Sequence, residues 1–401
     1  MTRSAIRTLP GKIIKTVKIP EPKVIEGYGA RASAGEICLR RGYTKVLLIT
    51  DRTLLKLGYH NSVRDSLEER GISCTVFSDI SSEPDTDIIK AGTEAALECG
   101  AEAIVALGGG SVMDASKMIA AGVRLKSINE HFLLLKFLFV PRKTIPLINI
   151  PSTAGTGAEL TVGAVITDTV LKTKGATVIV GLDIKDVILD SELTVRAPAK
   201  VTAACGIDAL SHGLEGCVAD IRSEDEDRKK SMECVRLVLE SLPKVLEHPE
   251  DIEARQSMCR AANYGGNAIN KQLAGYVHAF AHSIGSEYHI PHGEAIAASL
   301  MPVIEHQKGS CTGKLAELAA YCGIKGETES DSADRLLESI NKLIKESGAL
   351  PEHIDIPEKD YHKLTVKISR DSINYSAPTT LKDKEIKRIL WHIQNQQSRL
   401  S

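Results

Sequence analysis

The sequence contains no cysteine pair of the kind that holds zinc or builds a disulfide framework. Its nine cysteines are dispersed, and no two of them are separated by only two to four residues. A cysteine zinc site needs such a spacing, and a small secreted scaffold needs an even, clustered set. An odd and dispersed number of cysteines is typical of a reducing compartment. We therefore expect a cytoplasmic protein.

The sequence also lacks long apolar runs and an excess of charge of one sign. Its longest apolar stretch, residues 132–140, is interrupted by Lys136 and is far shorter than a membrane-spanning helix. Residues 1–20 carry charges throughout and contain no apolar segment of a signal peptide. The 50 basic and 52 acidic residues give a net charge of −2, which provides no broad positive field. We expect neither nucleic acid nor a membrane as a partner.

What the sequence does contain is enough chain for two domains. Its 401 residues exceed one ordinary core, and 43% hydrophobic and 25% charged residues are globular values. In the first half, short β-branched runs alternate with helical segments, which is typical of a parallel sheet with crossover helices. From about residue 192 onward, amphipathic helical patterns replace them. The sequence predicts an α/β domain over residues 1–195 and an all-helical domain over residues 196–401. The clearest segments are expected strands at 46–50, 74–78, 104–107 and 147–150, and expected helices at 332–345 and 382–393.

Two loops rich in small residues follow expected strands. Residues 108–110 are three glycines that open into a helix, and their amides together with the helix N-terminus suit a pyrophosphate. Residues 151–159 contain the hydroxyls of Thr153 and Thr156, which suit a sugar-phosphate. A tight turn without a ligand would use the same residues, so each loop alone leaves both interpretations open. Two such loops at one edge of a parallel sheet favour a ligand site, because open α/β sheets bind ligands there.

Asp51 ends the first of the expected strands. A carboxylate at this position can accept hydrogen bonds from a ribose 2′-hydroxyl, and it would then repel a 2′-phosphate. It is equally suited to cap the helix that follows. If Asp51 contacts a dinucleotide, NAD is preferred over NADP.

Two segments pair potential metal ligands at helical spacing. Asp208 and His212 are four residues apart, as are His278 and His282. Residues at this spacing project from one face of a helix, about one turn apart. Each pair therefore presents two side chains in one direction.

Four of the twelve histidines lie within fifteen residues, because His289 and His292 follow the second pair. We expect Gly285 and Pro291 to break the helix so that these two side chains fold back toward its face. A single histidine on an apolar face is usually a hydrogen-bonded core residue. Four of them with an aspartate indicate a metal site, and this donor set suits Fe(II) or Zn(II) better than magnesium or calcium.

Taken together, these segments strongly resemble the iron-containing (group III) alcohol dehydrogenases over nearly the whole chain. The resemblance implies an N-terminal dinucleotide-binding α/β domain and a C-terminal all-helical metal-binding domain. The resemblance thus implies a dehydroquinate synthase-like architecture with the active site in the cleft between the domains. The matching segments are residues 108–114, 151–159, 206–212 with Glu215, 278–282, 291–293 and 377–381.

The resemblance also assigns roles by position. His282 would line the substrate cavity beside the nicotinamide and is the candidate catalytic residue, whereas no role is implied for His289. The implied metal ligands are Asp208, His212, His278 and His292. The expected cofactor-binding residues are Asp51, Gly108, Gly109, Gly110, Ser111, Asp114, Thr153, Thr156 and Lys174.

The expected activity is NAD(H)-dependent interconversion of a small alcohol with its aldehyde or ketone, in a homo-oligomer of two or more chains. The metal, Fe(II) or Zn(II), would polarise the substrate oxygen while hydride moves to or from the nicotinamide. The alternative is a dehydroquinate-synthase-like lyase that uses NAD transiently on a sugar-phosphate. A lyase would need lysine or arginine near the metal, and residues 203–218 and 275–293 contain none. A non-catalytic scaffold is a third interpretation, and the intact ligand positions disfavour it.

Overall fold

The computed structural model describes residues 19–81, 83–126, 137–170, 173–220, 224–372 and 375–395, without the side chains of residues 173 and 174. The chain forms two compact units. Of the described residues, those up to residue 153 and residues 157–196 form the α/β unit, and residues 154–156 and those from residue 197 onward form the helical unit.

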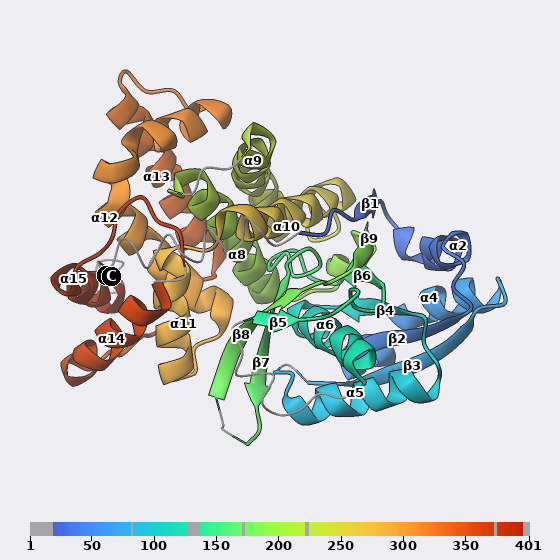
Figure 1. Cartoon of the computed structure of the whole chain (residues 1–401). Coiled ribbons are helices and arrows are strands. Elements are labelled where there is room, and N and C mark those ends of the chain that lie inside the picture. The colour runs from blue at the N-terminus through green and yellow to red at the C-terminus, as the bar shows by residue number, and fades with distance from the viewer. Residues whose placement is uncertain are drawn as a thin grey trace. The chain divides into compact units, whose positions relative to one another are not determined.

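The α/β unit is built on a six-stranded sheet in the order β1-β9-β6-β4-β2-β3. Every neighbouring pair of its strands is parallel, which confirms the predicted parallel sheet (Figure 1). β4 and β6 are buried at every position, as in a sheet covered on both faces. The strands are β1 (Lys23–Glu26), β2 (Lys45–Asp51), β3 (Ser73–Ile80), β4 (Ala103–Gly108), β6 (Leu147–Pro151) and β9 (Ile184–Leu189).

The helices of this unit connect the strands in the predicted alternation. Along the sheet α2 packs on α4, and α5 packs on α6. The elements are η1 (Ala30–Ser33), α2 (Ala34–Arg40), α3 (Arg52–Lys56), α4 (Tyr59–Glu68), α5 (Thr86–Glu98), α6 (Gly110–Leu125) and α7 (Glu192–Val195).

A second, three-stranded sheet was not predicted from the sequence. It consists of β5 (Phe137–Phe139), β8 (Thr173–Val180) and β7 (Gly163–Asp168) in that order. β7 and β8 pair antiparallel, whereas β5 pairs parallel to β8. The α/β unit therefore combines a parallel sheet with a small mixed one.

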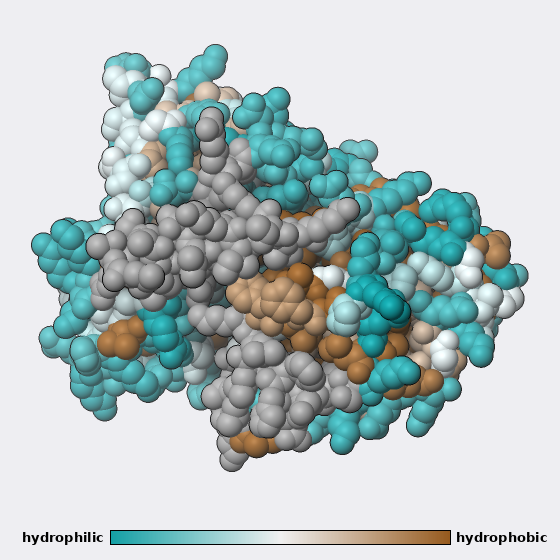
Figure 2. Space-filling view, in the orientation of Figure 1, coloured by the Kyte–Doolittle hydropathy of each residue, from teal (hydrophilic) through white to brown (hydrophobic). Residues whose placement is uncertain are grey.

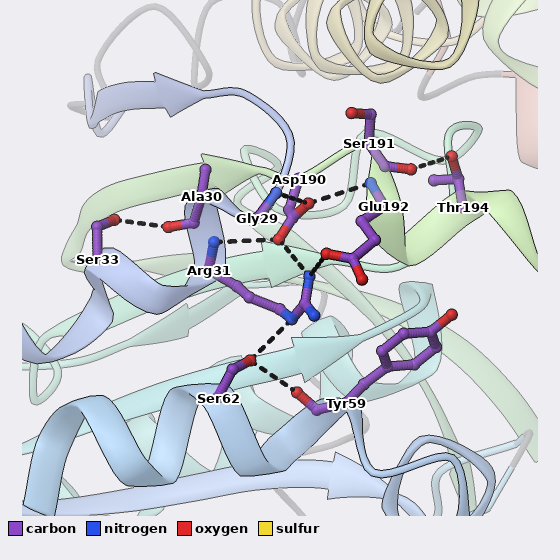
Figure 3. A network of polar contacts seen from close by, with 10 residues as sticks. All are labelled: Gly29, Ala30, Arg31, Ser33, Tyr59, Ser62, Asp190, Ser191, Glu192 and Thr194. Carbon is purple, nitrogen blue, oxygen red and sulfur yellow. Dashed lines mark hydrogen bonds and ion pairs between the residues drawn. The ribbon is translucent and has the colours of Figure 1, made fainter. Parts of the chain in front are cut away.

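An ionic network joins the segment that follows β1, the first strand of the large sheet, to the residues that follow β9, its last strand in the sequence (Figure 3). The guanidinium of Arg31 lies 2.8 Å from a carboxylate oxygen of Asp190 and 2.7 Å from one of Glu192. Asp190 also accepts hydrogen bonds from the backbone amides of Gly29, Arg31 and Glu192. Because its charge is paired and its oxygens are hydrogen-bonded, Asp190 can remain fully buried. The network fixes the loop after β1 against the end of β9.

The helical unit contains only helices among its described residues, as predicted. One hydrophobic core runs through it, and α8 packs on α9, α10 and α12. Hydrophilic side chains cover much of its described surface on the face shown in Figure 2. The elements are α8 (Ala199–Val218), α9 (Asp225–Glu247), α10 (Ile252–Gln272), α11 (Tyr276–Tyr288), α12 (His292–Tyr321), α13 (Glu329–Ser347), η3 (Glu358–Asp360), α14 (Tyr361–Asp371) and α15 (Asp383–Asn395).

The break between α11 and α12 corrects one expectation. Gly285 does not end a helix but lies inside α11, which continues to Tyr288. His289 ends it with a left-handed backbone at φ 55°, and Pro291 then precedes the first residue of α12. Gly285 instead allows the turn to pack closely, because a β-carbon there would lie 3.0 Å from the backbone oxygen of Ile290.

None of the helices among the described residues is long and apolar enough to span a membrane.

Candidate functional site

Three helices of the helical unit bring the four predicted metal ligands together. Asp208 and His212 lie one turn apart on α8, His278 is in the first turn of α11, and His292 begins α12. One carboxylate oxygen of Asp208, Oδ1, lies 3.6 Å from Nε2 of His212, 3.7 Å from Nε2 of His278 and 3.4 Å from Nε2 of His292. Three imidazole nitrogens thus converge on one carboxylate oxygen.

The donor set fits a divalent ion. Asp208 Oδ1 and His278 Nε2 are buried, and neither has a hydrogen-bond partner among the described residues. Buried polar atoms are rarely left unpaired, so a shared cation is the natural partner for both. Oxygen and nitrogen ligands about 2.1 Å from a tetrahedral ion lie about 3.4 Å from one another, which is close to the distances from Asp208 Oδ1 to the three imidazole nitrogens. Donor atoms of Asp208, His278 and His292 all lie within 4.8 Å of one another, and His212 is outside this group of three. Nitrogen and oxygen donors without sulfur suit Fe(II) or Zn(II).

The electrostatics of the cluster keep Asp208 negatively charged. Burial alone would raise its pKa, but the surrounding imidazoles of His212, His292 and His278 hold the pKa well below its usual range. Burial lowers the pKa of His212 to about 3, which leaves its imidazole neutral. A carboxylate beside a neutral imidazole is the state in which these side chains can bind a cation.

Glu215 orients one of the histidines. It lies on α8 seven residues after Asp208, and one of its oxygens is 2.6 Å from Nδ1 of His278. The same carboxylate accepts hydrogen bonds from the backbone amides of Gly275 and Val277 at 2.9 and 2.7 Å. Glu215 therefore accepts a hydrogen bond from Nδ1–H of His278 and leaves Nε2 directed toward Asp208. The spacing of seven residues placed Glu215 on the same face as Asp208, but the sequence alone assigned it no role.

Glu215 also affects the charge of His278. Burial opposes protonation, but the negative charges of Glu215 and Asp208 and the hydrogen bond to Glu215 raise the pKa of His278 to about 9. A metal ion would have to displace this proton from Nε2.

His282 lies beside the cluster rather than in it. Its ring stacks on that of His292 with centroids 5.1 Å apart and meets the ring of His278 edge-on at 5.8 Å. Its Nδ1 lies 3.0 Å from the hydroxyl of Tyr375, a residue that no sequence pattern singled out. His289 is exposed at the end of α11 and makes none of these ring contacts.

The predicted dinucleotide residues of the α/β unit lie at the carboxyl ends of three adjacent strands. β2 ends at Asp51, β4 at Gly108, and β6 just before Ser152 and Thr153. A β-carbon on Gly108 would lie 2.4 Å from the side chain of Val112, so only glycine fits there. Gly109 caps α6, and the first helical residues are Gly110 and Ser111.

Asp51 caps a helix, which was one of its two interpretations. Its Oδ1 accepts hydrogen bonds from the backbone amides of Thr53 and Leu54 at 2.8 and 2.9 Å. Both bonds use the same oxygen, so a ribose contact through Oδ2 remains compatible with the cap. The cofactor role of Asp51 stays a prediction.

Both carboxylate oxygens of Asp114 contact other residues of the α/β unit. Its Oδ1 lies 3.0 Å from Nζ of the buried Lys117, and its Oδ2 accepts a hydrogen bond from the backbone amide of Val165 at 2.9 Å. Lys117 also donates to Thr161 and to the carbonyl of Gly163. Asp114 thus fixes α6 against the start of β7, and a cofactor contact by it stays a prediction.

Two further predicted cofactor residues lie elsewhere. Thr156 belongs to the helical unit together with Gly155, whose missing β-carbon would lie 2.8 Å from Cα of Cys205 on α8. Lys174 lies in β8, but its side chain is outside the described part of the structure. The roles of both residues stay predictions.

Comparisons with known proteins agree with the chemistry of the site. Residues 21–181 match the family model described as iron-containing alcohol dehydrogenase, and residues 202–393 match that of the C-terminal part of the Fe-containing alcohol dehydrogenase family. The probable alcohol dehydrogenase EutG of Salmonella typhimurium is 31% identical over 359 residues, covering 87% of this chain and 89% of that protein. The NAD-dependent methanol dehydrogenase of Bacillus methanolicus is 29% identical over 383 residues, covering 93% and 98%.

A comparison with solved structures finds proteins of the same kind. The crystal structure of a 1,3-propanediol oxidoreductase superposes with a TM-score of 0.88 at 27% identity, covering 94% of this chain and 99% of that one. These relatives are alcohol dehydrogenases or oxidoreductases of alcohols, so the lyase alternative is not favoured. The two family models together cover most of the chain and confirm the expected family and fold class. The chain belongs to the iron-containing alcohol dehydrogenase family and is an oxidoreductase that acts on alcohols.

Proposed function

We propose that this alcohol dehydrogenase interconverts a small primary or secondary alcohol with its aldehyde or ketone, using NAD(H) and a divalent metal, iron or zinc. The observation that carries the proposal is the convergence of three histidine Nε2 atoms on Oδ1 of Asp208. The NAD dependence of the Bacillus methanolicus relative supports the choice of cofactor.

Within this proposal, Asp208, His212, His278 and His292 hold the ion. When bound, the ion supplies a Lewis acid that stabilises the negative charge that develops on the substrate oxygen. Glu215 accepts a hydrogen bond from Nδ1–H of His278 and so holds the proton on Nδ1, which leaves the lone pair of Nε2 to bind the ion.

His282 is the proposed catalytic residue. Its ring lies against those of His278 and His292, two of the residues that would hold the ion. A neutral imidazole can pass a proton between substrate and solvent near neutral pH. This role separates His282 from the four proposed ligands.

The α/β unit supplies the proposed cofactor site. The glycines 108–110 let backbone amides approach the pyrophosphate, and the N-terminus of α6 adds partial positive charge. Asp51 would accept from the ribose 2′-hydroxyl and disfavour NADP. Ser111, Asp114, Thr153, Thr156 and Lys174 complete the proposed set.

We also propose that the enzyme is cytoplasmic and acts as a homo-oligomer. The nine cysteines are unpaired, which supports a reducing compartment. Light scattering combined with size-exclusion chromatography tests the oligomer, and a mass of one chain would contradict it.

The function is tested on protein that is stripped of metal and then reloaded with Fe(II) or Zn(II) without oxygen. Metal content is measured by elemental analysis, and NADH is followed at equilibrium and during turnover with short alcohols and aldehydes. We expect net NADH formation or consumption that requires the metal. A lyase would show substrate loss with no net NADH, and an absence of turnover with every metal and substrate would contradict the proposal.

A further inference from the structure

Tyr375 contacts the proposed catalytic histidine from a distant part of the chain. It lies between α14 and α15, and its hydroxyl oxygen is 3.0 Å from Nδ1 of His282, 93 residues away in the sequence. The two rings meet edge to face with centroids 6.3 Å apart. Among the residues that the structure describes, His282 is the only hydrogen-bond partner of this hydroxyl.

The surroundings of Tyr375 determine the direction of this hydrogen bond. Burial, together with the charges of Asp371 and Glu215, raises the pKa of the Tyr375 hydroxyl, so it keeps its proton. The half-buried hydroxyl needs an acceptor for its proton, and Nδ1 of His282 is the acceptor that the described residues offer. A neutral imidazole that accepts at Nδ1 carries its own proton on Nε2.

The ring that is held in this way lies against two proposed metal ligands, His278 and His292. We propose that Tyr375 is a positioning residue, whose hydroxyl donates to Nδ1 of His282 and fixes both the ring orientation and the Nε2–H tautomer that the reaction uses. Tyr375 acts through His282 and need not touch the substrate. The proposal rests on the proposed function, because it takes His282 as the catalytic residue.

Removal of the Tyr375 hydroxyl tests whether this group contributes to the rate of the reaction. Tyr375→Phe keeps the aromatic ring but leaves the His282 tautomer unselected, so we expect kcat to fall about tenfold, with KM for NADH and substrate within about twofold. The assay uses zinc-loaded enzyme and the best substrate of the panel described above. Tyr361→Phe is the matched control, because its hydroxyl also makes one hydrogen bond, at 2.9 Å, but to Gln394 and not to a histidine. Equal effects of the two variants on kcat would overturn the proposal.

A double-mutant cycle tests whether Tyr375 acts through His282. In the His282→Ala background, Tyr375→Phe should cause no further loss of kcat, because the group that it positions is gone. Losses that multiply would show an independent role of Tyr375 and would overturn the proposal.

The tautomer itself is measured without turnover. In zinc-loaded protein labelled with 15N-histidine, long-range proton–nitrogen spectra distinguish imidazoles protonated at Nδ1 from those protonated at Nε2. The His282 signals, assigned from their loss in His282→Ala, should report protonation at Nε2 in the wild-type protein and a mixture in Tyr375→Phe. An unchanged tautomer in the variant would overturn the proposal. A wild-type enzyme without NADH-linked turnover would refute the proposed function, whereas the tautomer measurement would still decide the role of Tyr375.

Discussion

Glu215→Gln is the substitution that most directly tests how the metal centre is built. The carboxylate of Glu215 accepts three hydrogen bonds, from Nδ1 of His278 at 2.6 Å and from the amides of Gly275 and Val277 at 2.9 and 2.7 Å. Glutamine has nearly the same shape, but one of its two end groups is a donor. At least one of the three buried donors must then lose its acceptor.

The magnitude follows from that count. A buried donor without an acceptor costs about 1–3 kcal/mol, so the unfolding free energy of the metal-free variant should fall by that amount. His278 would also be held less firmly, and loss of such a supporting hydrogen bond typically weakens metal binding about 10–100-fold. We expect both losses in the same variant.

Zinc affinity is measured by competition with a chromophoric chelator near neutral pH, and unfolding by urea titration followed by circular dichroism. Asp227→Asn is the control, because Asp227 is likewise a buried acid of the helical unit and accepts a hydrogen bond, at 3.1 Å from Asn267. The control should keep its zinc affinity. If Glu215→Gln bound zinc within about twofold of wild type, the proposed support of His278 would be refuted.

Further predictions concern the ligands and the cofactor site. Asp208→Asn removes the charge that three histidines share, so zinc affinity should fall at least about 100-fold, and elemental analysis showing full metal content would count against the ligand set. In the metal-free protein the pKa of His278 is raised from 6.5 to about 9 by neighbouring carboxylates, against the effect of burial. Protonation of His278 therefore stabilises the folded protein, fully below pH 6.5 and progressively less as the pH rises through about 9. A urea-stability profile that stays flat over this window would contradict this prediction. Gly108→Ala should destabilise the enzyme by about 1–3 kcal/mol and weaken NADH binding in a fluorescence titration, because a β-carbon there overlaps the side chain of a neighbouring valine; unchanged values for both would be inconsistent with the packing. Asp51→Asn preserves the helix cap but not the charge, so the kcat/KM ratio for NADP over NAD should rise about tenfold with unchanged melting temperature, and a constant ratio would argue against the ribose contact.

Local periodicity was enough to predict much of this fold. The β-branched runs before the glycine loop and before residue 151 became β4 and β6, because buried parallel strands need continuous apolar sequence. The spacing of Asp208 and His212 likewise survived, since four residues make about one helical turn wherever the helix packs.

Features that depend on long-range contacts could not be predicted in this way. The pairing of Tyr375 with His282 spans 93 residues and follows from the path of a loop, which has no periodic pattern. The role of Glu215 depends on where the first amides of α11 lie. In the sequence Gly285 is typical of a helix end, and only the structure shows that it is needed because the backbone of Ile290 passes close to it. The β7–β8 pair was missed for a similar reason, because strands with half-exposed faces carry weaker hydrophobic patterns.

The three residues 154–156 bear on how this protein can be divided experimentally. They belong to the helical unit although both of their flanks in the sequence belong to the α/β unit. Gly155 lies directly against Cys205, one turn before Asp208, where there is no room for a side chain. A fragment that starts at residue 197 would therefore lack a strip of backbone that covers α8 beside the histidines. The two units are not separable genetic modules, and a metal-binding fragment would have to carry this tripeptide as an added segment or a grafted loop.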